Sequence, residues 1–512
     1  MLFGSYYKIA NVLCFHHNDC YWNFVIFMND SSNLKNQVLH SLKWVALGKV
    51  LTQIIRWIMT FWVIRLLMPE DYGVVAMADA LFGFLTLIIG GLFTPSIIQA
   101  KELTEKILKQ IFGAVLLVHS FVFLTQFLAA DAIGEFYQSD NVANILKLNA
   151  WCFLLLAIQI IPSAVLAREM EFKKISIISA IANITAAITT FSLALLGYGF
   201  WALIIGEIVA ISLQTVMVLF INPIKYLPEF KISEVKPFIK FGSLLTVHSI
   251  VFYIFLHLDV TIAGRMLTAS EVGLFAVGLQ FALMPQKKIL PLLKQVAFPA
   301  FSKIQNQPER ITNYIIKAQK LSLIVTIPVF WGLAAVVDLV IPIVIGDKWS
   351  GAIVPTMIML FIMPLRFSEE LFNPAIKSQQ KAAHLLTNAL IMLTLLLVSV
   401  LFFVEEGAIG LALAWVCGFP LAYMIVVSRN CRLFNIKYKS IAELFVAPFG
   451  AGIFMLLSVY AMKLLSSNIS IVNLLSQVLV GGFIFVCALY LFDKKLLTEL
   501  KMLLKRSPKN SE

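Results

Sequence analysis

The segment Arg65-Leu-Leu-Met-Pro-Glu-Asp71-Tyr-Gly73-Val-Val-Ala76 decides the fold, because it recurs later in the chain as Arg265-Met-Leu-Thr-Ala-Ser-Glu271-Val-Gly273-Leu-Phe-Ala276. Arginine, leucine, an acid, glycine and alanine occupy matching positions in the two copies. Each copy ends one long apolar run and begins the next. This recurrence predicts a chain built from two similar halves.

A second pair of segments supports the repeat. Gly197-Tyr-Gly-Phe-Trp-Ala-Leu203 precedes the sixth apolar run, and Gly407-Ala-Ile-Gly-Leu-Ala-Leu413 precedes the twelfth. Matching segments therefore lie six runs apart. If every run crosses a membrane, this even separation gives both copies one orientation, which predicts a parallel repeat about an axis along the membrane normal.

The composition excludes a soluble globular protein. Of 512 residues, 60% are apolar and 13% are charged, whereas soluble proteins have about half and about a quarter. One membrane-spanning helix uses about 20 apolar residues, so the chain can supply about fourteen of them with little left for a large extramembrane domain. We therefore expect an all-α polytopic membrane protein with two six-helix bundles in parallel pseudo-repeat and two further C-terminal helices.

The apolar runs give the expected boundaries. The spans are near residues 38–66, 73–98, 107–129, 145–166, 175–195, 201–221, 238–264, 272–300, 315–343, 353–376, 382–404, 409–428, 442–465 and 471–492. The expected organisation is an N-terminal extension (1–37), a first bundle (38–221), a cytoplasmic linker (222–237), a second bundle (238–428), two additional membrane helices (429–492) and a basic cytoplasmic tail (493–512). Because residues 1–34 fit neither a span nor a soluble domain, we expect a segment upstream of the true start, with an interfacial helix as the alternative.

The basic residues predict the orientation. Lys plus Arg exceed Asp plus Glu by 40 to 28, and in a membrane protein such an excess marks cytoplasmic loops rather than contacts with nucleic acid. The even-numbered connections are basic, for example at Lys101, Lys106 and Lys109, whereas the odd-numbered ones are acidic, as at Glu405 and Glu406. Both termini are therefore expected in the cytoplasm. The basic tail is expected to be solvated, with contact to anionic lipid headgroups as the alternative.

Cations inside the spans are the first candidates for a binding site, since a buried charge costs about 2.5–3.5 kcal/mol at mid-bilayer. Lys49 and Arg56 share one face of the first span, Lys287 and Lys288 lie between two prolines of the eighth, and Arg366 lies in the tenth. They predict a cationic lumen that holds an anionic headgroup, because an arginine fork binds phosphate oxygens bidentately. The alternative is that Lys49 and Lys294 snorkel to the interface while Arg56 bonds to backbone carbonyls. Arg366 is the weakest candidate, because Glu369 and Glu370 can neutralise it within its own helix.

Acids inside the spans are candidates for ion coupling. Glu207 lies deep in the sixth span, whereas Asp79 and Asp259 lie near the outer ends of theirs, where solvent or a helix-terminal partner is the common explanation. The histidines in the spans are isolated, and the N-terminal cluster from Cys14 to Cys20 lacks the two separated ligand pairs of a structural zinc site. No metal and no cofactor are therefore expected.

The sequence resembles the polysaccharide transporter branch of the multidrug/oligosaccharidyl-lipid/polysaccharide exporter superfamily, in particular the colanic-acid-type lipopolysaccharide exporters. The similar segments are Leu42-Lys43-Trp44 with Gly48, Arg65 to Met77, Gln99 to Thr104, Ala167 to Lys174, Gly197 to Leu203, Leu258-Asp259 with Gly264-Arg265, and Gly346-Asp-Lys-Trp349. The resemblance implies a flippase of the bacterial plasma (inner) membrane that moves undecaprenyl-pyrophosphate-linked oligosaccharides by alternating access. It also implies as partners this lipid-linked glycan, membrane lipids, and a polysaccharide polymerase or export machinery.

Other functions remain as alternatives. A multidrug cation antiporter of the same superfamily would need an acidic lumen, whereas the first span offers Lys49 and Arg56 without an acid. A membrane glycosyltransferase or polymerase would need catalytic side chains on an aqueous face, and the short loops and the lack of a P-loop, HExxH or GxSxG motif argue against any enzyme. A structural scaffold would leave the mid-bilayer arginine unexplained.

Overall fold

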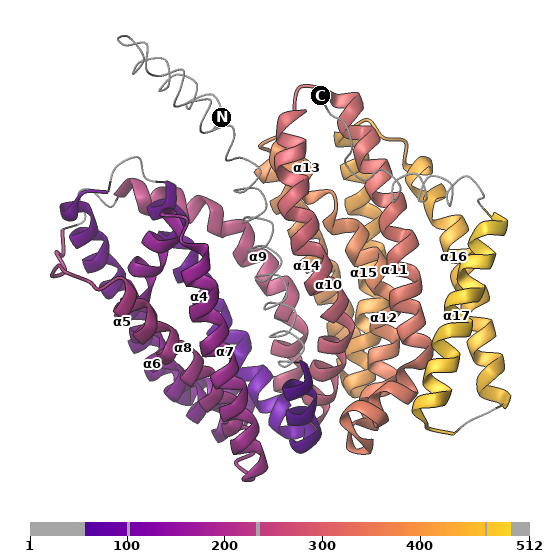
Figure 1. Ribbon diagram of the computed structural model, residues 1–512, viewed down its shortest axis with the longest axis horizontal. Coiled ribbons are helices and arrows are strands. Elements are labelled where there is room, and N and C mark those ends of the chain that lie inside the picture. Colours follow the sequence, from indigo (N-terminus) through magenta and orange to yellow (C-terminus); the bar gives the residue numbers. More distant parts are fainter. Residues whose placement is uncertain (1–56, 100–102, 232–235, 466–467, 493–512) are drawn as a thin grey trace, which may run out of the picture. The chain divides into compact units, whose positions relative to one another are not determined.

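The structure is a computed structural model that describes residues 57–99, 103–231, 236–465 and 468–492. Across these residues every regular element is a helix, and no strand occurs (Figure 1). The chain forms two compact units, residues 1–58 and 59–512. All contacts described below lie within the second unit.

The helices of the first half follow the expected spans closely. A short apolar helix, Trp57–Leu66, is the described part of the first span. It is followed by α4 (Pro69–Gln99), α5 (Glu105–Tyr137), α6 (Asp140–Arg168), α7 (Phe172–Leu195) and α8 (Trp201–Ile221).

The second half repeats this succession and continues beyond it. Its helices are α9 (Lys236–Met266), α10 (Ala269–Lys303), α11 (Pro308–Ile345), α12 (Ile353–Glu370) with the short α13 (Asn373–Ser378), α14 (Ala382–Phe403) and α15 (Gly407–Leu433). The 3-10 turns η1 (Asp347–Ala352) and η2 (Val404–Glu406) precede α12 and α15, and the trailing helices are α16 (Tyr438–Leu465) and α17 (Ile471–Phe492).

The helices fit a protein that crosses a membrane many times. Among the described residues, 11 segments are long and apolar enough to span a bilayer, and one of them, Ala382–Leu433, contains both α14 and α15. Helix α10 also has 35 residues and is long enough, but it is less apolar and is not one of these 11 segments. With α10 counted and α14 and α15 separated, the expected spans after the first are all present as helices.

The two copies of the repeated segment pack directly against each other. A Cβ on Gly73 would lie 1.7 Å from the carbonyl oxygen of Ala269, and a Cβ on Gly273 would lie 1.8 Å from that of Pro69. Helices α4 and α10 therefore cross with their backbones in contact, and the prediction of a pseudo-repeat is confirmed. The repeated glycine is explained, because a methyl group at either position would separate the helices.

The repeated acid caps its own helix and contacts the second repeated segment. In the first half, Asp71 accepts hydrogen bonds from the amides of Met68 (2.8 Å) and Phe200 (2.9 Å). In the second half, Glu271 forms a capping box with Thr268. A Cβ on Gly407 would lie 2.4 Å from Glu271 Oε1. The two sequence echoes thus arise from one local arrangement that occurs twice.

The repeated arginine joins one half to the other. Arg65 Nη1 donates to the carbonyl of Ile343 at 3.4 Å, and Arg265 Nη1 donates to the carbonyl of Phe136 at 2.9 Å. Ile343 lies near the C-terminus of α11 and Phe136 near that of α5, the third helix of the opposite half in each case. Trp349, fully buried, adds a 2.9 Å bond from Nε1 to the carbonyl of Ile64.

The trailing helices pack on α11. Figure 1 shows α16 and α17 in yellow beside it, and a cluster that includes Leu323, Met455 and Phe485 fills the contact. Lys463 of α16 binds both carboxylate oxygens of Asp338 of α11 at 2.6 Å. This ion pair fixes the C-terminal part of α16 against α11.

Candidate functional site

The expected cationic lumen is only partly within view. Lys49 and Arg56 lie outside the described residues, so their role stays a prediction from sequence. Lys287 and Lys288 lie on α10 and are both exposed. Arg366 lies on α12 and is buried, with 5% of its surface exposed.

Arg366 is held by an aromatic ring and by acids from two helices. Its guanidinium carbon lies 4.3 Å from the centre of the Trp415 ring on α15, a cation–π contact. Asp259, Glu370 and Glu369 act on it electrostatically. The expectation that its helical neighbours alone neutralise Arg366 was therefore incomplete, because Asp259 contributes from α9.

One nitrogen of Arg366 is left without a partner. Its Nη1 is buried and makes no hydrogen bond to the protein. An unsatisfied buried donor costs about 1–3 kcal/mol, and more when the group is charged. A donor of this kind is able to donate a hydrogen bond to a carboxylate, a phosphate oxygen or a water molecule.

Asp259 is not at a solvated helix end, which corrects the expectation from its position in the sequence. It is fully buried. Its Oδ2 accepts a 2.7 Å hydrogen bond from Trp415 Nε1, and its Oδ1 accepts one from the amide of Val260 at 2.7 Å. Trp415 thus contacts Asp259 through its ring N–H and Arg366 through the face of its ring.

The charges continue along α10 and α12. Lys294 of α10 forms an ion pair with Glu370, and Asn373 donates to the same carboxylate oxygen at 3.1 Å. Lys294 is therefore paired within the protein.

Further charges adjoin this pair. Lys377 of α13 lies within electrostatic range of Lys294 and Glu370. Lys287 lies within such range of Arg366. We call the combined set the charged cluster: Asp259, Lys287, Lys294, Arg366, Glu369, Glu370 and Lys377.

The remaining acidic candidates form a separate pair in the first half. Asp79 on α4 is exposed, Glu207 on α8 is partly buried, and the two carboxyl groups are electrostatic neighbours. Tyr253 of α9 donates to the backbone carbonyl of Asp79 at 3.3 Å. The three predicted coupling residues thus divide between two places, with Asp259 in the charged cluster and Asp79 beside Glu207.

Two features of the cluster were missed from sequence. Glu369 and Glu370 were considered only as neutralising neighbours of Arg366, although three ionisable groups in one apolar helix already signal a shared polar site. Trp415 carried no such signal, because a tryptophan in an apolar run is ordinary. In the described part of the chain, no group of three or more His, Cys, Asp or Glu residues is arranged to hold a metal ion.

Comparison with known proteins places the chain among polysaccharide biosynthesis proteins. Residues 62–354 match the family described as "Polysaccharide biosynthesis protein". The chain belongs to this family. The match covers the repeated segment in both copies, together with Asp79, Glu207, Asp259, Lys287 and Lys288, and it ends before Arg366.

Three relatives in the polysaccharide biosynthesis family illustrate its range. The chain is 24% identical to an uncharacterized membrane protein in the cps region of Klebsiella pneumoniae, over 93% of this chain and 99% of that protein. It is 27% identical to the lipopolysaccharide biosynthesis protein WzxC of Escherichia coli, over 65% and 68%. It is 24% identical to the succinoglycan biosynthesis transport protein ExoT of Rhizobium meliloti, over 76% and 79%.

Solved structures support the fold assignment for this family member. The chain is similar to the lipid II flippase MurJ in an inward closed conformation, with a TM-score of 0.72, 15% identity, and coverage of 89% of this chain and 99% of that one. An inward-facing multidrug resistance MATE transporter gives a TM-score of 0.57 at 12% identity, over 75% and 94%. The chain therefore has the fold shared by these two transporter groups.

Proposed function

We propose that the protein is a flippase that moves undecaprenyl-pyrophosphate-linked oligosaccharide across the bacterial plasma membrane for surface polysaccharide synthesis. The observation that carries this proposal is the charged cluster, in which exposed lysines lie beside a buried arginine with an unpartnered nitrogen. The family membership, the name of ExoT as a transport protein and the name of MurJ as a lipid II flippase support it.

The chemistry of the charged cluster suits a pyrophosphate. Lys287 of the cluster and its neighbour in the sequence, Lys288, are exposed lysines that attract an anion, whereas Arg366 offers a planar fork that binds phosphate oxygens. The acids of the cluster hold Arg366 charged while no substrate is bound. In this proposal the lysines attract the headgroup. Arg56, which the sequence places on the first span, contributes a further positive charge.

The acidic pair Asp79 and Glu207 is proposed to couple transport to an ion. Two neighbouring carboxylates repel each other, and a bound proton or sodium ion relieves that repulsion. This pair is also the feature that favours the alternative, a multidrug cation antiporter. The two functions differ in cargo, since the antiporter carries a cation and the flippase an anionic lipid. Both termini are proposed to face the cytoplasm, with a polymerase or export machinery as further partners.

The experiment is an assay of precursor position in a strain that lacks the protein. The wild-type chain should restore polysaccharide export and clear lipid-linked precursor from the inner leaflet. Lys287→Gln with Lys288→Gln should leave precursor in the inner leaflet at matched protein levels, and Arg56→Ala should do the same. The matched control is Lys317→Gln, which removes an exposed lysine on α11 outside the cluster. If the wild-type chain leaves precursor in place but exports cationic drugs, the antiporter is correct.

A further inference from the structure

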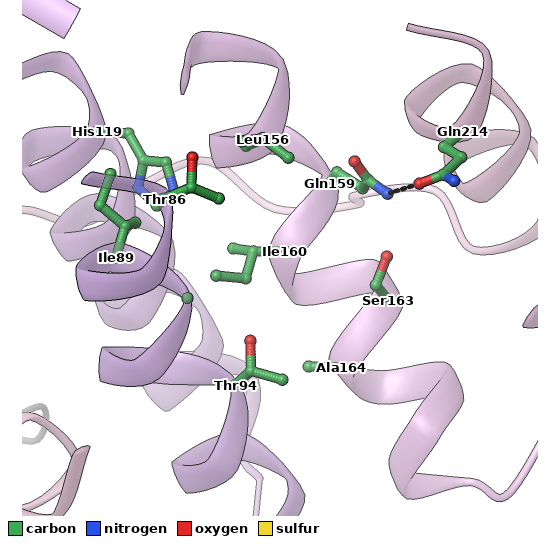
Figure 2. A pocket seen from close by; sticks show the side chains of 11 residues that line it. Thr86, Ile89, Thr94, His119, Leu156, Gln159, Ile160, Ser163, Ala164 and Gln214 are labelled. Carbon is green, nitrogen blue, oxygen red and sulfur yellow. Dashed lines mark hydrogen bonds between the residues drawn. The ribbon is translucent and has the colours of Figure 1, made fainter. Parts of the chain in front are cut away.

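A second polar site lies inside the first half, away from the charged cluster. A cavity of about 270 Å³ is bounded by α4, α5, α6 and α8 (Figure 2). At about 30 Å³ for each water molecule, this volume equals about nine waters. Its polar lining consists of Thr86, Thr94, His119, Gln159, Ser163 and Gln214.

The lining of the cavity is mostly apolar surface into which six polar side chains are set, and it carries no formal charge. Among the described residues that line it, none is Asp, Glu, Lys or Arg. His119 is buried, and its Nδ1 lies 2.8 Å from the carbonyl oxygen of Val115. Nδ1 must therefore carry the proton and donate, which leaves Nε2 as an acceptor in the neutral ring.

The two glutamines retain hydrogen-bonding capacity. Gln159 donates to Gln214 Oε1 at 3.3 Å, a bond drawn in Figure 2, and its own Oε1 accepts a 3.3 Å bond from Thr215. A side-chain amide has two N–H donors, so this arrangement uses one donor of Gln159 and none of Gln214. In the view of Figure 2, these amides lie on the opposite side of Ile160 from Thr86 and His119.

This lining excludes several classes of ligand. A pyrophosphate or a carboxylate would find no cation, and a metal ion would find no carboxylate. A polyprenyl tail would cover hydroxyl and amide groups without satisfying them, which is unfavourable. A neutral sugar suits the cavity, because each hydroxyl both donates and accepts, while its C–H faces pack on Leu156 and Ile160.

We propose that this cavity binds a neutral sugar of the lipid-linked glycan, a proposal that rests on the flippase function above. The cavity extends along α4 from Thr86 to Thr94, eight residues or about 12 Å. Thr86 follows Asp79, and Gln214 follows Glu207, by seven residues each, which is two helical turns on the same face. The sugar site and the acidic pair thus lie on the same faces of α4 and α8, two helical turns apart.

The test compares binding of probes with and without sugar to the full-length protein in lipid nanodiscs. The probes are citronellyl pyrophosphate alone and the same compound carrying glucose, galactose or N-acetylglucosamine. The wild-type protein should bind at least one sugar-bearing probe at least about tenfold more tightly than the bare pyrophosphate, which corresponds to about 1.4 kcal/mol. Gln159→Leu with Gln214→Leu should abolish this preference and leave the affinity for the bare probe unchanged.

The control is Gln477→Leu, the same change at a buried glutamine of α17, which should leave all four affinities unchanged. A second variant, Ser163→Phe, fills the cavity and should also remove the sugar preference. Equal binding of bare and sugar-bearing probes by the wild-type protein would show that the cavity holds water only, and the sugar site would be wrong while the flippase proposal stands. If the double variant binds all four probes more weakly by the same factor, the two amides have a structural role only. That result would also overturn the site. Failure of the wild-type protein to bind any probe would overturn both proposals.

Discussion

Gly73 and Gly273 face each other across the crossing of α4 and α10, and each meets the carbonyl oxygen of the residue four positions before the other. The Cβ positions would lie 1.7 Å from Ala269 O and 1.8 Å from Pro69 O. Such distances are far below any real carbon–oxygen contact. The two halves of the chain are therefore joined by backbone packing that only glycine permits.

We expect Gly73→Ala and Gly273→Ala each to destabilise the protein by roughly 1–3 kcal/mol, the cost of forcing extra atoms into a packed contact. The obstacle is a backbone carbonyl oxygen in both cases, so no side-chain rotation relieves it. The measurement is thermal unfolding of purified protein in detergent.

The control for the glycine substitutions is Gly482→Ala. A Cβ at Gly482 meets no atom within 4 Å, so this change should be neutral or stabilising through the higher helix propensity of alanine. Equal melting temperatures for Gly273→Ala and the wild type would contradict the close crossing.

The contact between Arg265 and Phe136 should control how the two halves separate. A hydrogen bond from a charged donor contributes about 1.5–3 kcal/mol, so Arg265→Ala should shift the population toward separated halves by about tenfold or more. Double electron–electron resonance measures the distance between spin labels placed at Leu196 and Phe402, which are both exposed. It should detect a larger fraction of long label-to-label distances in Arg265→Ala than in the wild type. The labels require a background without the native cysteines.

The matched control for Arg265 is Arg310→Ala. Arg310 Nη1 donates to Gln307 within its own turn, at 2.7 Å, and among the residues that the structure describes it bonds to no other helix. Its loss should leave the distance distribution as in the wild type. An unchanged distribution in Arg265→Ala as well would mean that the arginine contact does not hold the halves together.

Much of the fold could be predicted from the sequence, because a membrane span is a local pattern. The apolar run at residues 201–221 predicted a membrane span with the bounds of α8. The repeated segments at Arg65 and Arg265 predicted two halves of one orientation. The charged cluster could be predicted only in part. Lys287 and Arg366 are visible as charges in apolar helices, but the partner Trp415 is far away in the chain and has no unusual local sequence. Helix periodicity does not report which faces meet.

The charge pattern predicts the orientation of the chain in the membrane. Reporters fused after residues 105, 172 and 232 should give cytoplasmic signals, and those after residues 138 and 406 should give signals from the outer side, because basic loops are retained in the cytoplasm. The measurement is the activity ratio of a reporter pair in which each enzyme is active on only one side. A consistent reversal at all five sites would overturn the topology.

The relation between Asp259 and Arg366 allows stability and transport to be separated. In the native chain, Trp415 Nε1 donates to Asp259 Oδ2 at 2.7 Å. Asp259→Asn keeps an acceptor for this bond but removes a negative charge that faces Arg366. We expect a loss of roughly 1–3 kcal/mol, less than the about 3–5 kcal/mol of a directly bonded buried pair, because Glu369 and Glu370 still face the guanidinium. Adding Arg366→Met should recover much of this loss, since the uncompensated charge is gone and the sulfur still packs on the indole. Thermal unfolding measures the loss and recovery of stability. Precursor accumulation in the inner leaflet measures transport. If Arg366 contacts the headgroup, the double variant should be stable yet fail to export; a stable double variant that exports normally would assign Arg366 a purely structural role.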